Sequence, residues 1–191
     1  VEALRAEQLE KYEKNLKQSK STQENKLIEE IKDIKKELEN LKIKPNYKTD
    51  LSSSENLKDL KKQLDQSNVK NIIKDKSKNI IKDNKVGDFT FRYQTIKNLP
   101  SKELRTIIDA GKKDIKRGVL IAFSILDGKV GVSVGVTKDL IEKFDAVDLV
   151  KVASSILGGK GGGGRKDFAQ AGGDNENKIE EASQAVLKKI S

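Results

Sequence analysis

The chain has 191 residues, no cysteine and no histidine, and 36% of its residues are charged against 35% hydrophobic. The missing residue types exclude disulfides, zinc sites of the Cys/His kind, thiolate nucleophiles and imidazole acid–base chemistry. The charged fraction is high for one compact globule, so we expect part of the chain to be exposed helix or linker. A net charge of +9 favours nucleic acid or an anionic membrane as partner, although solvated lysines would give the same excess.

The sequence gives no sign of membrane insertion. No apolar run approaches the roughly 20 residues that a membrane span needs, and no signal peptide is visible. We therefore expect a soluble, cytoplasmic chain without a membrane partner. It contains no methionine, even at residue 1, which is typical of a fragment of a longer polypeptide.

Residues 1–43 are predicted to form an antiparallel helical hairpin. Apolar residues at helical spacing cover 1–18, and Ser19–Thr22 interrupts the pattern. Ser21 and Glu24 have the spacing of a capping box, which marks the start of a second helix that ends near Ile43. In this second helix a heptad seam provides the packing face of the hairpin, formed by Leu27, Ile31, Ile34, Leu38 and Leu41.

Residues 44–86 are interpreted as a basic linker rich in Lys, Asn and Ser. Pro45 ends the preceding helix. Ser52 and Glu55 again have capping-box spacing and, with the leucines that follow, predict one short helix. The six residues at 70–75 recur at 78–83, and we expect them to lie in linker or in a weakly packed strand or helix.

Residues 87–191 predict a small α+β domain with helices against a mixed sheet, in the order β-α-β-β-α-loop-α. The expected elements are a strand at 89–93, a helix from Ser101, strands at 119–126 and 130–136 joined by the hairpin turn Asp127-Gly128, a helix from Thr137 to about Leu157, a glycine loop, and a last helix.

The stretch 158–173 carries the strongest functional signal. Four consecutive glycines, Gly161, Gly162, Gly163 and Gly164, precede Arg165, and Gln170 begins the run Gln-Ala-Gly-Gly. Glycines bare the backbone N–H groups and permit positive φ, so a polyanion can approach closely, and an adjacent arginine strengthens such a site. A flexible linker is the alternative. We favour the binding loop, because a flexible linker would need neither Arg165 nor the Gln-Ala-Gly-Gly run that follows it.

Two further features have two interpretations each. Arg105, Lys112 and Lys116 share one flank of the helix after Ser101 and are candidate phosphate contacts. They fit slightly better as a solvated face in which Asp109 pairs with Arg105. Phe168 is suited equally to stacking on an exposed base and to filling the core.

The glycine stretch closely resembles the signature of the C-terminal domain of alanyl-tRNA synthetase, a domain shared with DHH-family phosphoesterases. Residues 127–130, 137–140 and 148–153 resemble the same domain, and 1–43 resemble the coiled segment before it. The likeness covers about 1–43 and 87–191. The sequence departs from the family at Lys166 and Phe168, where Pro and Met are usual.

This resemblance implies a non-catalytic C-terminal fragment of an alanine–tRNA ligase. Such a domain binds the tRNA elbow, where the D and T loops meet, and holds the tRNA for the aminoacylation and editing domains. The contact residues carried over are Gly161–Gly164, Arg165 and Gln170. No cofactor or metal is expected in this chain, since ATP, magnesium and zinc would belong to other domains of the parent enzyme. The implied partners are tRNA, those other domains and, as in some members of the family, a second copy.

Two other functions stay open. Nucleases and phosphoesterases of the DHH family use the same domain type for single strands or small phosphorylated substrates, usually with His where Arg165 stands. A coiled-coil dimerisation module would instead rely on the leucine seam. Arg165 and the helical segment upstream both favour the synthetase.

Overall fold

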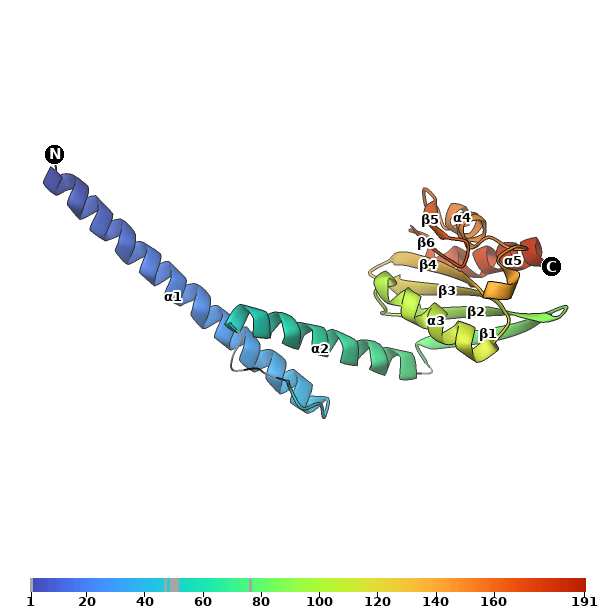
Figure 1. Cartoon of the computed structure of the whole chain (residues 1–191), viewed down its shortest axis with the longest axis horizontal. Helices are drawn as coiled ribbons and strands as arrows, with labels where there is room; N and C mark the ends of the chain where they lie inside the picture. The colour runs from blue at the N-terminus through green and yellow to red at the C-terminus, as the bar shows by residue number, and fades with distance from the viewer. Residues whose placement is uncertain (1, 47, 49–51, 76) are drawn as a thin grey trace. The chain divides into compact units, whose positions relative to one another are not determined.

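The structure is a computed structural model that describes residues 2–46, 48, 52–75 and 77–191. Side chains are described from Lys11 onward, except that of Leu16. Two compact units make up the chain, residues 1–68 and 69–191, and the boundary falls inside helix α2 (Ser53–Lys74). Figure 1 shows the long helix α1 (Glu2–Asn40) of the first unit and the sheet of the second.

Helix α1 is continuous, so the predicted interruption at Ser19–Thr22 is wrong. The segment contains neither glycine nor proline. The hydroxyl of Thr22 donates a hydrogen bond to the carbonyl oxygen of Gln18, 2.8 Å away. A threonine on an exposed helix face satisfies its hydroxyl in this way without ending the helix.

The apolar seam of α1 packs against α2. Ser52–Ser54 line the same groove as residues between Lys20 and Leu27, and Lys61 pairs with Glu30 at 2.9 Å. The two helices therefore run in the same direction, which corrects the antiparallel hairpin predicted within 1–43. The side chains of residues 1–10 and of Leu16 are outside the described part of the structure, and so is the packing predicted for them. The buried cluster between the helices contains Leu27, Ile31, Ile34, Leu38, Ile43, Leu57, Leu60 and Leu64.

A capping box begins α2, as the sequence predicts, although the helix has 22 residues and is not short. The carboxylate of Glu55 accepts a hydrogen bond from the backbone N–H of Ser52 at 3.0 Å. The N–H of Glu55 donates to the hydroxyl of Ser52 at 3.3 Å. The hydrogen bonds from Ser52 hold the pKa of Glu55 below its ordinary value.

We expect Ser52→Ala to destabilise the first turn of α2 by about 1 kcal/mol, because an N–H at the helix start loses its acceptor. Ser21→Ala is the matched control. It removes the similar motif inside α1 and should change stability by less than about 0.5 kcal/mol. Amide hydrogen exchange in the two segments measures both effects, and equal losses at the two serines would contradict the assignment.

Six strands form one mixed sheet in the order β1-β2-β3-β4-β6-β5. Strands β2 and β3 are parallel and are joined by helix α3 (Leu104–Ile115), whereas the other neighbours are antiparallel. The α+β class with a mixed sheet is thus confirmed. The strands are β1 (Asn79–Val86), β2 (Phe89–Lys97), β3 (Gly118–Leu126), β4 (Lys129–Val136), β5 (Gly162–Arg165) and β6 (Phe168–Gly173).

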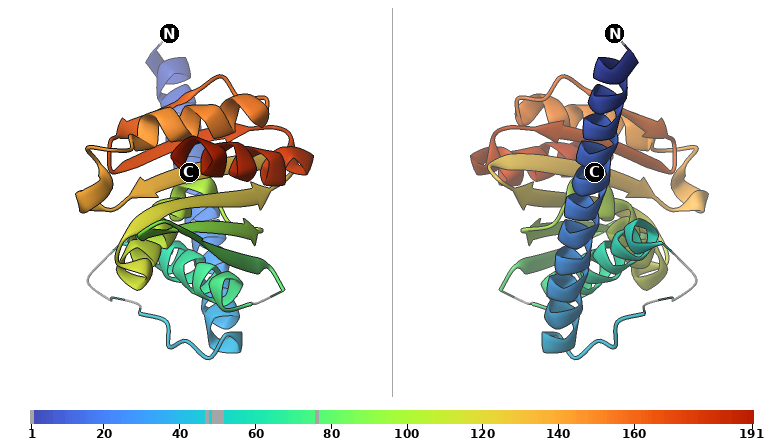
Figure 2. Two further views of the ribbon diagram at one scale, coloured as in Figure 1. Left: turned by 90° about the vertical axis from the view of Figure 1, so that its right-hand side faces the viewer. Right: turned by 90° about the vertical axis from the view of Figure 1, so that its left-hand side faces the viewer.

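Helices cover both faces of the sheet. On one face α4 (Ala146–Ile156) and α5 (Ile179–Ile190) pack against each other and over the valines and phenylalanines of the central strands; Figure 2 shows these two helices side by side. Helix α3 and the last residues of α2 cover the opposite face, which we call the α3 face. There Leu104, Ile108 and Leu120 are buried.

The alternation of valine with glycine or serine along β4 follows from this arrangement. Its four valines face the core under α4 and α5. On the α3 face, a Cβ at Gly135 would lie 2.3 Å from Cγ2 of Ile108, and one at Gly131 would lie 2.5 Å from Cβ of Ser101. Glycine therefore allows α3, and the 3-10 turn Ser101–Glu103 before it, to approach the sheet closely.

Two predicted elements differ from the structure, and the structure decides a third that the sequence left open. The glycine stretch is not a loop, because β5 and β6 pair as an antiparallel hairpin within it. The helix predicted from Thr137 is a short 3-10 turn followed by α4, which begins where the carboxylate of Asp145 accepts a hydrogen bond from the N–H of Val147 at 2.8 Å. Residues 79–86, expected in linker or in a weakly packed strand or helix, form strand β1.

Candidate nucleic-acid interface

Strand β5 lies at one edge of the sheet and carries the glycine cluster. Gly161 and Gly164 have φ angles of +111° and +153°, which favour glycine. A Cβ at Gly162 would lie 2.5 Å from the Cβ of Ala171, so packing requires glycine there. Gly163 differs, because its φ is ordinary and a Cβ would meet nothing within 4 Å. Because Gly163 has no side chain, a ligand can approach the backbone of this exposed edge strand closely.

Asp167 anchors the turn between β5 and β6. Its carbonyl oxygen accepts hydrogen bonds from Nζ of Lys112 at 2.6 Å and from the N–H of Val136 at 3.0 Å. Its carboxylate lies 3.2 Å from Nε of Arg165 and 3.7 Å from Nζ of Lys112. Burial lowers the pKa of Lys112, and the charges of Asp167 and Asp109 oppose the shift. Lys112 therefore anchors the turn, whereas Arg165, with 67% of its side chain exposed, can meet a ligand.

Arg105 projects from α3 over the start of β6. Its guanidinium carbon lies 5.1 Å from the ring centroid of Phe168, and 57% of its side chain is exposed. Phe168 is only 8% exposed, so it fills the core beneath the arginine and does not offer its ring to a base. The carboxylate of Asp109 lies 3.9 Å from Nε of Arg105. An aromatic ring thus supports the planar cation at the surface.

Gln170 connects β6 to the turn before α3, because its Nε2 donates a hydrogen bond to the carbonyl oxygen of Ser101 at 2.9 Å. In the β5–β6 register Gln170 lies opposite Gly163, and Phe168 lies opposite Arg165. Residues directly opposite each other share a face of the sheet, here the α3 face. Four residues therefore meet on one surface, which we call the docking surface: Arg105, Gly163, Arg165 and Gln170.

Arg105, Lys112 and Lys116, which the sequence placed on one flank of the helix, do not form one contact surface. Only Arg105 belongs to the docking surface, and Lys112 is engaged with Asp167. Lys116 is exposed at the C-terminal end of α3, where its φ is +63°. It lies about 16 Å from Arg105 along the helix, at 1.5 Å per residue.

Two contacts that shape this site have no local signal in the sequence. The hydroxyl of Ser154, buried in α4, donates to the carbonyl oxygens of Gly172 at 2.9 Å and Gly161 at 3.3 Å. This ties both arms of the glycine hairpin to α4. The contact of Asp167 with Lys112 likewise joins residues that are 55 positions apart in the sequence, so no local motif indicates it.

In the part of the chain that the structure describes, no three acidic side chains converge as a metal site would require. Among the helices described, none is both long and apolar enough to cross a membrane.

Comparison with known proteins places the second unit in a family. The profile of the DHHA1 domain matches residues 88–191. The alanine–tRNA ligase of Hyphomonas neptunium is 54% identical over 85 residues, covering 44% of this chain and 10% of that protein. The alanine–tRNA ligase of Bradyrhizobium diazoefficiens is 47% identical over 107 residues, covering 56% of this chain and 12% of that protein. The chain thus spans about a tenth of the length of these curated relatives.

A solved structure gives the same result. The C-Ala domain from Aquifex aeolicus alanyl-tRNA synthetase is 35% identical, with a TM-score of 0.53 over 57% of this chain and 96% of that domain. The chain therefore belongs to the DHHA1 domain family, and its sequence and fold match the C-terminal domain of alanyl-tRNA synthetase.

Proposed function

We propose that this chain is the C-terminal part of an alanine–tRNA ligase and binds the elbow of folded tRNA through the docking surface. It holds the tRNA for the aminoacylation and editing domains of the same polypeptide in the cytoplasm, and catalyses neither reaction itself. The observation that carries the proposal is the exposed guanidinium of Arg105, held on Phe168 beside the glycine edge of β5.

The chemistry of the docking surface supports an RNA ligand. Arg105 offers a planar cation on which a nucleobase can stack. Arg165 is exposed and can bind phosphate oxygens through its guanidinium. The missing side chain at Gly163 lets a ribose or phosphate reach the β5 backbone. Stacking, phosphate contact and close backbone approach together recognise a folded shape and not a base sequence.

The charge of the chain supports the same ligand. A net charge of +9 attracts a polyanion, and each neutralised phosphate releases counterions. We therefore expect the affinity for tRNA to fall as salt rises. Little dependence on the anticodon or acceptor sequence is expected, since the proposed contacts carry no base code.

The proposal is tested by titrating the chain with folded tRNA and with an unstructured single strand of equal length. We expect a preference for folded tRNA, and Arg165→Ala should weaken that binding about fivefold, equivalent to roughly 1 kcal/mol for one exposed charged contact. The slope of affinity against salt should fall by about one phosphate contact.

Equal affinity for the two RNAs, untouched by Arg165→Ala, would overturn the elbow-binding proposal. Binding of that kind would indicate non-specific lysine charge. A clear preference for the single strand would instead favour the single-strand function of the DHH nucleases.

A further inference from the structure

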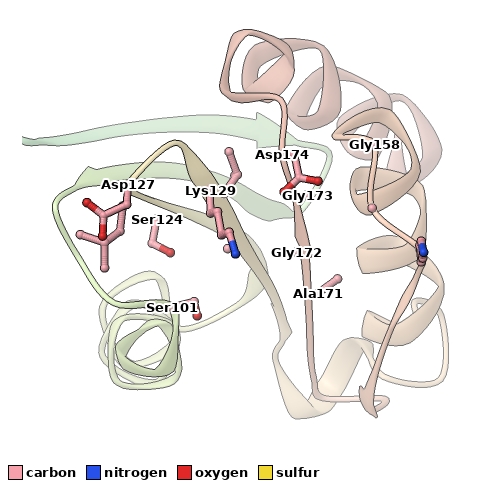
Figure 3. Close-up of a pocket in the computed structure, with 14 residues that line it drawn as sticks. Ser101, Ser124, Asp127, Lys129, Gly158, Ala171, Gly172, Gly173 and Asp174 are labelled. Atoms are coloured by element: carbon pink, nitrogen blue, oxygen red, sulfur yellow. The ribbon is translucent and has the colours of Figure 1, made fainter.

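A cleft of about 670 Å³ opens on the α3 face, at the end of the sheet where β3, β4 and β6 meet. The turn between β3 and β4 forms one wall, with Asp127 and Lys129. The end of β6 with Gly172, and the loop 158–160, form the others. Figure 3 shows Ser101 and Ser124 among the residues that complete the lining.

Packing or backbone geometry explains four of the five glycines that line this cleft, but not Gly172. Gly158 has a φ of +79°, and a Cβ at Gly131, Gly159 or Gly173 would lie within 2.5 Å of a neighbouring atom. At Gly172 a Cβ would meet only the carbonyl oxygen of Val130, at an ordinary 3.4 Å, and φ is not left-handed. A glycine inside a strand is destabilising relative to alanine. Its visible effect here is to keep space open above β6.

Ser124 supplies a polar group that the fold does not use. It is 2% exposed and lines the cleft. No hydrogen bond between described residues involves its hydroxyl, which is not sealed from solvent. A polar atom that enters the cleft can therefore form a hydrogen bond with it.

The charges at the cleft argue against a simple anion site. Lys129 and Lys160 are balanced by Asp127 and Asp174 in the same lining. A free phosphate would meet two carboxylates as well as two ammonium groups. A neutral, flat group with donors and acceptors on its edge suits both the bare glycine backbone and the Ser124 hydroxyl. The cleft volume is within the range of small-molecule sites, about 300–1,000 Å³.

We propose that this cleft binds an unstacked nucleobase of the RNA that the docking surface holds, an inference that rests on the proposed function. Ser101 connects the two places, because its carbonyl oxygen accepts from Gln170 of the docking surface while the residue also lines the cleft. Proteins that recognise RNA loops commonly splay out a base and bind its edge. The base edge meets Ser124, and its face lies along the backbone of Gly172.

The test is an amide NMR titration of the whole chain with guanosine, adenosine, uridine and cytidine, each compared with inorganic phosphate. At least one nucleoside should shift the amides of Gly131, Gly172 and Gly173 saturably, whereas phosphate alone should not. Gly172→Val fills the cleft without backbone strain and should abolish these shifts. Ser124→Ala should weaken them while leaving the fold intact, since the lost hydroxyl has no partner.

Folded tRNA gives the second measurement. Gly172→Val should weaken tRNA binding about fivefold, with an unchanged thermal midpoint as the control for folding. Cleft amides that no nucleoside shifts, or that phosphate shifts equally, would overturn the cleft proposal even if tRNA binds and Arg165→Ala weakens it. Nucleoside shifts in a chain with no affinity for tRNA would overturn the proposed function and leave the cleft as a nucleoside site.

Discussion

Gly135→Val is expected to push α3 away from the sheet and to weaken tRNA binding at the same time. The first carbon of the new side chain would lie 2.3 Å from Cγ2 of Ile108 and 2.9 Å from Cε of Lys112. Ile108 is fully buried, and side chains in a close-packed core can shift little to admit added atoms. Overpacking of this kind typically lowers the free energy of unfolding by about 1–3 kcal/mol.

The loss of binding follows from what α3 carries. Lys112 holds the β5–β6 turn through the carbonyl oxygen of Asp167, and Arg105 rests on Phe168 of β6. A helix displaced from β4 breaks both contacts, so the docking surface loses its geometry. We expect the affinity for folded tRNA to fall about tenfold, or roughly 1.4 kcal/mol.

Gly163→Val is the matched control, the same substitution on the same sheet. A Cβ at Gly163 meets nothing within 4 Å, so we expect unchanged or slightly higher stability together with weaker tRNA binding. Denaturant unfolding and tRNA titration of both variants separate the two effects. Unchanged stability in Gly135→Val would contradict the close packing of α3 on β4.

The sheet could be predicted largely from its sequence because its local signals agree with its burial. Valines at every second position of β4 give a one-sided strand, and the turn Asp127-Gly128 has positive φ at both residues, 51° and 72°, as this hairpin type requires. The structure shows that the glycines on the other side of β4 allow α3 to pack closely against the sheet. No local sequence pattern indicates that α3, which connects the parallel strands β2 and β3, lies against those glycines.

The identical sequences at 70–75 and 78–83 adopt different secondary structures, which a local sequence pattern cannot predict. Ile72 and Ile73 lie in α2 and pack against the apolar cluster of the α3 face. The corresponding Ile80 and Ile81 lie in β1, with 46% and 48% of their surface exposed. The ladder with β2 fixes the second copy as a strand. Tertiary context, absent from a six-residue window, decides between the two structures.

The two capping-box motifs also show that the same local pattern can have different structural outcomes. Helix α1 ends at Asn40, before Pro45, so the hydrogen bonds of Ser52 and Glu55 begin a new helix, α2. Ser21 has the same spacing to Glu24 but lies among good helix formers, and α1 continues through it. A capping motif therefore marks a helix start only where something else ends the preceding helix.

The candidate site was predicted in its parts but not in its assembly. The glycines, Arg165 and Gln170 are close in sequence, and their pattern indicated an anion-binding stretch. Arg105 lies on a helix some sixty residues earlier in the chain, and its contact with Phe168 exists because α3 crosses over the sheet between β2 and β3. The separation of Lys112 and Lys116 into different roles also depends on that crossover.

Arg105→Ala should produce the largest loss of tRNA affinity among single substitutions on the docking surface. A base stacked on an aromatic side chain contributes about 1–3 kcal/mol. We expect the planar guanidinium to contribute in the same range, so affinity should fall by roughly 5- to 150-fold. The ring of Phe168 lies 5.1 Å from the guanidinium carbon, and this contact restricts the arginine side chain before RNA arrives. The substitution also exposes part of that ring, and an unfolding measurement is needed beside the titration.

Arg105→Lys separates the contribution of the planar guanidinium to tRNA affinity from the contribution of its positive charge. Lysine keeps the positive charge but has no planar group to stack, so we expect most of the loss to persist while the salt dependence stays close to that of the unaltered chain. Lys116→Ala is the control on the same helix, because it removes an exposed cation outside the docking surface. It should weaken binding less than about twofold. If Arg105→Lys binds like the unaltered chain, or if Lys116→Ala costs as much as Arg105→Ala, then Arg105 acts only as one positive charge among many, and the elbow is not recognised by stacking on α3.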